Sequence, residues 1–303
     1  MQVTPNLLKS LENGFNTALI DGLNSYLPNT YWAKIAMETQ SKHAEENYGW
    51  LEMFPGLREF VGQRVINNLS SVPYTVKNKT FENTIAVKRT AIEDDAINLY
   101  GNVFRMQGEA AAMHPDEMMF AKILGGFDAT GGLAYDGQYF FDADHVGYAA
   151  NKAEISYSNV QAGSSPPWLL LDLRRNFMRP FIMQNRSTVE FAAQNKPEDD
   201  NVFMRDEHLY GVRVRYNAGY GFHQLALGSK AELTADSYRA ARTAMMTQRR
   251  PDGNPLPVIP SLLVYGPTNE YAVKKLINSD KLDSGASNPW FQSVPTLMVE
   301  WMQ

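Results

Sequence analysis

The sequence predicts an α+β protein of 303 residues without an internal repeat. Three patterns predict this class. An apolar face at helical spacing runs through residues 1–27, a longer helical pattern covers residues 91–126, and short β-rich runs fill much of the remainder. A hydrophobic content of 44% is enough to bury a core, and the length fits one large domain or two modest ones.

The first predicted helix lies within residues 1–27. Thr4 is a candidate N-cap, and Pro5 suits the first helical turn, where a missing N–H costs nothing. Apolar side chains recur along one face, at Leu7, Leu8, Leu11, Phe15, Leu19 and Leu23. Two alternatives remain open for the placement of this helix. It docks on its own domain, or it forms an arm that reaches a neighbouring molecule.

Residues 47–90 predict a long two-stranded hairpin. Val72–Val76 and Asn83–Arg89 are β-rich runs, and the tripeptide 77–79 between them is a turn signal. The stretch holds few large apolar residues, and an isolated two-stranded hairpin is marginal in water. We therefore expect it to lie on something else, either its own domain or another subunit.

The longest predicted helix covers residues 91–126. The acidic triplet 93–95 precedes it, where the helix dipole favours negative charge. Pro115 is expected to kink or restart the helix, because its ring removes a backbone donor and clashes with the previous turn. The glycines at 125–126 are expected to end it. One apolar face is shared by Ile97, Tyr100, Phe104 and Ala111.

The C-terminal half alternates strands and helices after a stretch at 127–166 that is rich in Gly, Asp and Tyr. A helix is predicted from an N-cap at Thr234 to Arg249, followed by a turn at 251–253. A second, shorter helix is predicted at Pro267–Asn278. Strands are predicted at Trp168–Leu171, Phe181–Met183, Val189–Ala192, Leu209–Tyr216, Val258–Tyr265 and Val294–Trp301.

Composition excludes several classes of function. The chain has no cysteine, which rules out disulfides, thiolate metal sites and cysteine nucleophiles. No secretory signal and no run of 18 apolar residues is visible, so no membrane association is expected. The net charge is −5, from 28 basic and 33 acidic side chains, whereas tight DNA binding by counterion release favours a basic surplus.

The candidate chemical sites have simpler structural interpretations. Asp142, Asp144 and His145 are the donor types of a metal site, but their spacing fits no calcium loop, and an Asp-rich turn explains them. The string HPDE at 114–117 is interpreted as a helix restart rather than a His–carboxylate pair. The acidic triplet 93–95 is interpreted as a helix N-terminus rather than an acid/base pair.

The glycine-rich stretch 125–132 lacks the GK[ST] of a phosphate-binding loop, so it is interpreted as a flexible connection. No enzymatic activity, cofactor or metal is therefore expected. A soluble hydrolase that uses Asp142, Asp144 and His145 is the remaining enzymatic alternative.

Several strings, taken in order, resemble the Mu-like phage major head subunit family, whose head protein is called gpT. The resemblance runs nearly end to end, and the ordered set carries it rather than any single string. The strings are YGWLEMFPGLREFVGQRV at 48–65, IEDD at 92–95, HPDE at 114–117, YDGQYFFDADH at 135–145, LYGVRVRYNAGYGFHQLA at 209–226, PSLLVYGP at 260–267 and SNPW at 287–290.

The resemblance implies the HK-ninety-seven type capsid fold. Residues 1–45 would form the N-terminal arm and residues 46–90 an extended E-loop hairpin. Residues 91–165 would hold the spine helix and peripheral domain, and residues 166–303 the axial domain interleaved with returning peripheral segments. The implied protein is a tailed-phage major capsid protein that self-assembles into hexamers and pentamers of an icosahedral head around double-stranded DNA. A shell protein of an encapsulin-like nanocompartment is the alternative within this fold.

The resemblance also implies partners and an assembly surface. Scaffold and protease are expected as separate chains, because the arm begins at Met1. A portal at one vertex and a decoration protein complete the expected virion, assembled in the bacterial cytoplasm. Lys77, Lys79 and Lys88 lie where one branch of the fold forms Lys–Asn crosslinks, although a solvated face explains them equally. The expected E-loop contacts are Trp50, Phe54, Pro55, Arg58, Phe60, Tyr74, Lys77 and Lys79.

Overall fold

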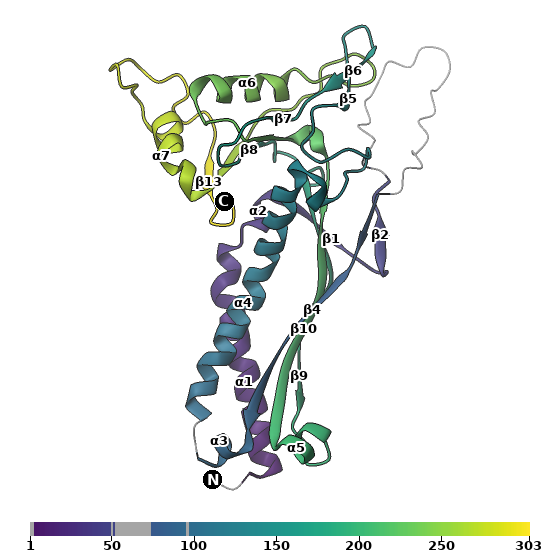
Figure 1. Cartoon of the computed structure of the whole chain (residues 1–303), viewed down its shortest axis with the longest axis vertical. Coiled ribbons are helices and arrows are strands. Elements are labelled where there is room, and N and C mark those ends of the chain that lie inside the picture. The colour runs from purple at the N-terminus through teal and green to yellow at the C-terminus, as the bar shows by residue number, and fades with distance from the viewer. Residues whose placement is uncertain (1–2, 50, 52–73, 95–96) are drawn as a thin grey trace.

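The computed structural model describes residues 3–49, 51, 74–94 and 97–303. The molecule is elongated (Figure 1): a broad upper part carries most of the short strands and helices, and a long, narrow lower part carries two long helices and a sheet. The mixture of helices and sheets confirms the predicted α+β class.

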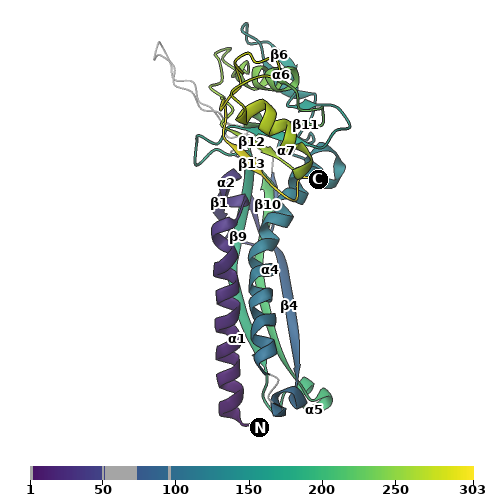
Figure 2. The same ribbon diagram turned by 90° about the vertical axis from the view of Figure 1, so that its left-hand side faces the viewer.

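The lower part consists of a helix pair packed beside a four-stranded sheet. Helices α1 (Pro5–Tyr26) and α4 (Ile97–Leu124) run side by side in both views (Figures 1 and 2). The sheet has the order β1–β9–β10–β4, with β1 parallel to β9 and the other neighbours antiparallel. Its strands are β1 (Ala36–Gln40), β4 (Lys79–Lys88), β9 (Phe181–Gln194) and β10 (Glu207–Tyr220).

The strand β9 joins the two parts of the molecule. Its first four residues, Phe181 to Gln184, are buried, as expected where a strand crosses a core. From Asn185 onward its residues alternate between half-buried and exposed, because only one face of the lower sheet meets the helices. The two runs predicted at 181–183 and 189–192 are therefore one continuous strand.

The helix α1 docks on its own chain, which is one of the two alternatives predicted for it. Thr4 caps it by accepting a hydrogen bond from the Leu7 backbone N–H at 3.2 Å, as predicted. Phe15 stacks on Phe104 of α4 at 4.3 Å between ring centroids and meets Tyr210 of β10 edge-on at 5.1 Å.

Two glycines bring the backbones of α1 and α4 into contact. A Cβ on Gly22 would lie 1.9 Å from the carbonyl oxygen of Arg105, and a Cβ on Gly108 would lie 2.0 Å from that of Leu19. No side chain fits at either position, so the pair sets how closely the helices pack.

The predicted hairpin around residues 77–79 is wrong. The short strand β3 (Thr75–Lys77) pairs with β2 (Glu45–Asn47), while β4 pairs with β10 from Lys79 opposite Tyr216 to Lys88 opposite Glu207. The two β-rich runs thus belong to different sheets, and each partner strand comes from elsewhere in the chain. The expectation that this stretch lies on its own domain is confirmed for β4.

The helix α4 runs through Pro115 without restarting, so the predicted restart is wrong. Phe104 before Pro115 and Met119 and Phe120 after it are fully buried, and this packing on both sides offsets the lost backbone hydrogen bond. The helix ends at Leu124, directly before Gly125, as predicted. A separate short helix, α3 (Arg89–Glu93), precedes it.

The upper part is built around a five-stranded sheet of order β13–β12–β8–β11–β7. Its central strand β8 (Trp168–Leu171) has the predicted bounds and is buried on both faces. Trp168 and Leu170 face a core shared with helix α6, whereas Leu169 and Leu171 face a second core shared with the end of α4. The other strands are β7 (Val160–Gln161), β11 (Ala226–Ser229), β12 (Leu262–Tyr265) and β13 (Thr296–Met298).

The helices of the upper part largely match the prediction. Helix α6 (Ala235–Met246) begins at the predicted N-cap: Thr234 Oγ1 accepts from the Ser237 backbone N–H at 3.2 Å, and Ser237 Oγ accepts from the Thr234 N–H at 2.9 Å. It ends three residues before Arg249. The predicted helix at 267–278 consists of a 3₁₀ turn, α7 (Glu270–Val273) and a π-helical turn (Lys274–Asn278).

Shorter elements complete the chain: α2 (Trp32–Ile35), α5 (Asp200–Arg205), and the paired strands β5 (His145–Tyr148) and β6 (Glu154–Tyr157). Among the residues that the structure describes, no helix combines the length and apolar character needed to cross a bilayer.

Candidate functional site

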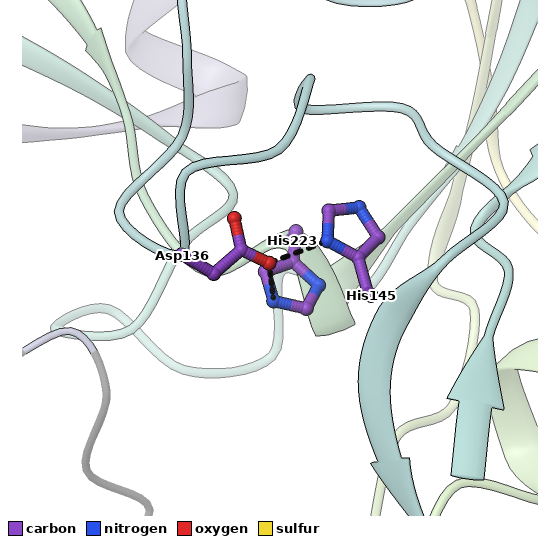
Figure 3. A group of neighbouring side chains, drawn as sticks. All are labelled: Asp136, His145 and His223. Carbon is purple, nitrogen blue, oxygen red and sulfur yellow. Dashed lines mark hydrogen bonds and ion pairs between the residues drawn. The ribbon is translucent and has the colours of Figure 1, made fainter.

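Asp136, His145 and His223 form a largely buried cluster of titratable side chains in the upper part (Figure 3). Asp136 comes from the loop before β5, His145 is the first residue of β5, and His223 begins the 3₁₀ turn after β10. Asp136 Oδ2 lies 2.6 Å from His145 Nδ1 and 3.3 Å from His223 Nε2. The two imidazole rings stack at 3.9 Å between centroids with 10° between their planes.

Hydrogen bonds hold His145 on both sides of its ring. Both ring nitrogens of His145 face oxygen atoms, Asp136 Oδ2 at 2.6 Å and the Phe140 carbonyl at 3.3 Å. Burial opposes ionisation of Asp136, but the hydrogen bond from His145 and the charges of both histidines outweigh it and lower the pKa of the carboxyl group.

His223 is the neutral member of the cluster. Burial, and then the neighbouring charge of His145, lower the pKa of His223 to about 3. Its Nε2–H can then donate to Asp136. The Tyr135 ring stacks on the His223 ring at 5.2 Å, so aromatic contacts hold the imidazole.

The ligand atoms of these three residues lie within 4.8 Å of one another, the spacing of a metal site. The ring geometry argues against chelation by both histidines. An imidazole presents its lone pair in the ring plane, so two histidines on one ion must direct their planes through a common point. Two rings stacked 3.9 Å apart and nearly parallel do not meet this condition. The geometry fits a hydrogen-bonded cluster better than a metal centre.

The cluster is part of a larger buried network of hydrogen bonds. Asn159 donates to the Phe140 carbonyl at 2.8 Å and to the His223 carbonyl at 3.3 Å, and its own side-chain oxygen accepts from the Asp142 N–H at 2.9 Å. These bonds fasten the string YDGQYFFDADH at 135–145 to the turn after β10. This hydrogen-bond network therefore holds distant segments of the chain together.

The three residues considered from the sequence as a metal site, Asp142, Asp144 and His145, do not come together in the structure. Asp142 caps its own turn, accepting from the Ala143 N–H at 2.7 Å and the Tyr139 N–H at 3.3 Å, as the Asp-rich turn interpretation predicts. Asp144 is exposed, and His145 points to Asp136 instead. Sequence reasoning missed Asp136 and His223, because nothing in the chain order brings His223 to a position 78 residues earlier. The hydrolase alternative required Asp142, Asp144 and His145 in one site, and the structure does not bring them together.

The HPDE string lies inside α4 and holds the start of α2 against it. Fully buried Asp116 accepts from the backbone N–H groups of Tyr31 at 2.9 Å and Trp32 at 2.6 Å, and so caps the start of α2. Burial raises the pKa of Asp116 despite these hydrogen bonds. His114 bonds the Tyr216 hydroxyl at 2.6 Å. The interpretation of this string as a helix restart is therefore wrong. Its polar residues instead make two long-range contacts.

The glycine-rich stretch 125–132 is closely packed. A Cβ on Gly131 would lie 2.0 Å from the Tyr220 hydroxyl, and one on Gly125 would lie 2.6 Å from the Gly131 nitrogen. Two 3₁₀ turns, Gly125–Phe127 and Ala129–Gly131, fold the stretch on itself. These glycines have a packing role in place of the flexible connection expected from the sequence.

Of the expected E-loop contacts, Trp50, Phe54, Pro55, Arg58 and Phe60 lie outside the described residues. Tyr74 is half-buried in its own chain, where its hydroxyl accepts from the Tyr220 N–H at 2.7 Å. Lys77 and Lys79 are exposed, and so is Lys88. Lys77 lies 3.8 Å from Glu45 across the β2–β3 pair, a solvated ion pair.

The base of this segment is firmly anchored. Buried Gln184 of β9 donates to the Val76 carbonyl at 3.0 Å and to the Asn78 side chain at 2.8 Å, and it accepts from the Tyr48 hydroxyl at 2.9 Å. One side chain thus holds both ends of the segment that connects β2 to β3.

Comparison with known proteins agrees with the resemblance read from the sequence. The model of the Mu-like prophage major head subunit gpT family matches residues 8–302. The major capsid protein of Escherichia phage Mu is 35% identical over 94% of this chain and 93% of its own length. The Mu-like prophage FluMu major head subunit of Haemophilus influenzae is 36% identical over 92% of this chain and 91% of its own.

Solved structures of one phage are similar as well. A procapsid chain of bacteriophage JBD30 is 39% identical, with a TM-score of 0.83, and covers 99% of this chain and 100% of its own length. A capsid chain of JBD30 is 29% identical, with a TM-score of 0.77, over 90% of this chain and 91% of its own. These matches confirm the phage capsid fold of the HK-ninety-seven type. This chain belongs to the Mu-like prophage major head subunit gpT family.

Proposed function

We propose that this chain is the major capsid protein of a tailed phage, and that its copies form the hexamers and pentamers of an icosahedral head around double-stranded DNA. The observation that carries the proposal is the end-to-end match to a procapsid chain, at 39% identity and a TM-score of 0.83. Family membership over residues 8–302 supports it independently. The relatives are head proteins, so the nanocompartment alternative is not favoured.

The shape of the chain suits contacts with several neighbours. Its lower part is narrow (Figure 1). Most residues of β4, a ten-residue strand in which only Val87 is buried, are exposed. The described residues that flank the expected E-loop segment are held together by Gln184. An anchored base is what an E-loop that lies on an adjacent copy requires. Many modest contacts per copy give slow dissociation.

A loop replacement tests this role. Residues 52–73 would be exchanged for a short Gly/Ser linker, which the adjacent strand ends Asn47 and Thr75 allow, because they face each other in the β2–β3 pair. The expected product is a folded chain, by circular dichroism, that forms no closed shells by electron microscopy. Unaltered chain expressed with its scaffold is the control. Closed shells of normal size from the replaced chain would rule out the E-loop role.

The expected partners follow from the same proposal. Scaffold and protease act as separate chains, a portal occupies one vertex, and a decoration protein covers the finished shell. One JBD30 structure shows a capsid decorated with minor capsid protein trimers, and its chain is 30% identical to this one with a TM-score of 0.72. Electron microscopy of this chain expressed with and without scaffold tests the scaffold's part. Assembly takes place in the host cytoplasm, and the virion is the destination.

Covalent crosslinking remains open to a direct test. Lys77, Lys79 and Lys88 are all exposed, as a solvated face also requires. We expect mature particles to dissociate into single chains of 34.1 kDa on a denaturing gel. A ladder of higher bands would show crosslinked neighbours.

A further inference from the structure

The helix α4 carries a second apolar face that its own chain leaves uncovered. One face packs on α1 and the lower sheet through Phe104, and Gly108 lies against α1. On the opposite side, Leu99 is 71% exposed, Val103 is 41% exposed and Met106 is 68% exposed. Ala110 is exposed and Met113 half-buried along the same line.

These five residues, named here the α4 stripe, recur at steps of three or four positions, so they lie in one row along the helix. A helix that is apolar on opposite sides is normally covered on both. The stripe has the spacing of a helix–helix seam rather than of scattered surface residues.

Charged residues on one flank of the stripe identify what covers it. Arg105 and Glu109 are both exposed and lie one turn apart. In an antiparallel helix pair related by a two-fold axis, each residue meets the one equally far on the other side of the axis, and each flank meets the same flank of the partner. With the axis at Met106, Leu99 lies directly opposite Met113, and Val103 lies within one residue of the point opposite Ala110.

The same axis places Arg105 of each copy within two residues, about 3 Å along the helix, of Glu109 of the other, a distance that these long side chains span. Both the apolar row and the flanking charges are therefore self-complementary, as a contact between identical patches across a two-fold axis requires.

We propose that the α4 stripe is an interface with a second copy of this chain, packed antiparallel across a two-fold axis centred near Met106. The inference rests on the proposed function, because a closed icosahedral shell brings identical chains together across two-fold axes. It adds a specific contact: the helix of the lower part, rather than the E-loop segment alone, joins copies of the chain.

Single-cysteine variants test the contact directly, because the chain has no cysteine of its own. In assembled particles under mild oxidation, Met106→Cys is expected to give a denatured band at twice the mass of the 34.1 kDa chain. Leu99→Cys is the matched control. Its two copies would lie about 21 Å apart, fourteen residues along a helix, so it should give no such band. The double variant Leu99→Cys, Met113→Cys should restore crosslinking.

A charge exchange tests the register without cysteines. Arg105→Glu brings like charges together and should reduce the yield of closed shells several-fold. Adding Glu109→Arg reverses both partners and should recover the yield. All five substituted positions are at least partly exposed, so the variants should fold, which circular dichroism checks.

Closed shells that contain Met106→Cys but show no dimer band would overturn the interface and leave the proposed function intact. A band of chain plus scaffold would assign the stripe to the scaffold and also overturn it. Failure of the unaltered chain to form shells with its scaffold would count against the proposed function itself.

Discussion

The upper and lower parts of this chain are stabilised in different ways. In the upper part, β8 is buried on both faces, between a core with α6 and a core with the end of α4. In the lower part, β4 exposes most of its residues, and a small aromatic group of Phe15, Phe104 and Tyr210 joins the helices to the sheet. One part is a thick, layered core, and the other is a thin extension of it.

The difference concerns how each part buries apolar area. Burial on two sides of a sheet gives the upper part a core of its own. The lower part keeps large apolar side chains such as Leu99 and Met106 in water, which is unfavourable unless another chain covers them. We therefore expect changes in the upper part to affect folding, and changes on the lower surface to affect assembly.

The largest expected effect comes from leucine-to-alanine substitutions, which should separate loss of folding stability from loss of assembly. Leu170→Ala removes a fully buried side chain from β8 and should lower the free energy of unfolding by about 2–5 kcal/mol. Leu99→Ala, on the exposed stripe, should change it by less than about 0.5 kcal/mol yet reduce shell formation. Urea unfolding and electron microscopy measure the two. Equal losses of stability would contradict the comparison.

Acid should weaken the upper part through His223. The pKa of His223 is about 3 in the folded chain and 6.5 in the reference state, so the unfolded chain binds the proton first. Stability is then level above pH 6.5 and falls as the pH drops toward 3, by at most about 1.4 kcal/mol per pH unit. Asp136, whose pKa is lowered from 3.8, adds a loss in the same direction at lower pH.

Urea unfolding of the unassembled chain at a series of pH values measures this slope. His223→Gln removes the titrating group and should flatten the curve between pH 6.5 and 4, although the variant starts less stable. An unchanged slope in the variant would assign the acid sensitivity elsewhere. A marked rise in melting temperature on adding Zn²⁺ would instead support a metal at the cluster.

The helix contact in the lower part should show a smaller, local effect. Gly108→Ala places a Cβ 2.0 Å from the Leu19 carbonyl oxygen, so α1 must move away, at a cost of about 1–3 kcal/mol. Gly101→Ala in the same helix meets nothing within 4 Å and should stabilise it by about 0.5–1 kcal/mol. Proteolysis of the N-terminal helix reports undocking. Equal resistance in both variants would mean that α1 is held by other contacts.

Local patterns predicted the elements well and their partners poorly. The bounds of β8 and the cap at Thr234 follow from residues within a few positions of each other. The pairing of β4 with β10 does not, because its partner lies more than a hundred residues away. The hairpin prediction failed for that reason, and the Asp136 cluster and the Gly108 contact were missed for the same reason. The family resemblance supplied the fold that these long-range contacts build.

The smallest expected effect compares two helix caps of the same chemistry. Thr234→Ala removes the cap of α6, whose Tyr238 and Met245 are fully buried in the upper core, and should lower global stability by about 1 kcal/mol. Thr4→Ala removes the matching cap of α1, where the Thr4 hydroxyl accepts from the Leu7 N–H.

Because the first turn of α1 lies at the far end of the thin part, the loss of its cap should fray that turn and leave the global unfolding midpoint nearly unchanged. Hydrogen exchange distinguishes fraying from global unfolding. A midpoint shift from Thr4→Ala as large as that from Thr234→Ala would show that both parts unfold as one unit, and would remove the basis for treating the lower part as an extension completed by its neighbours.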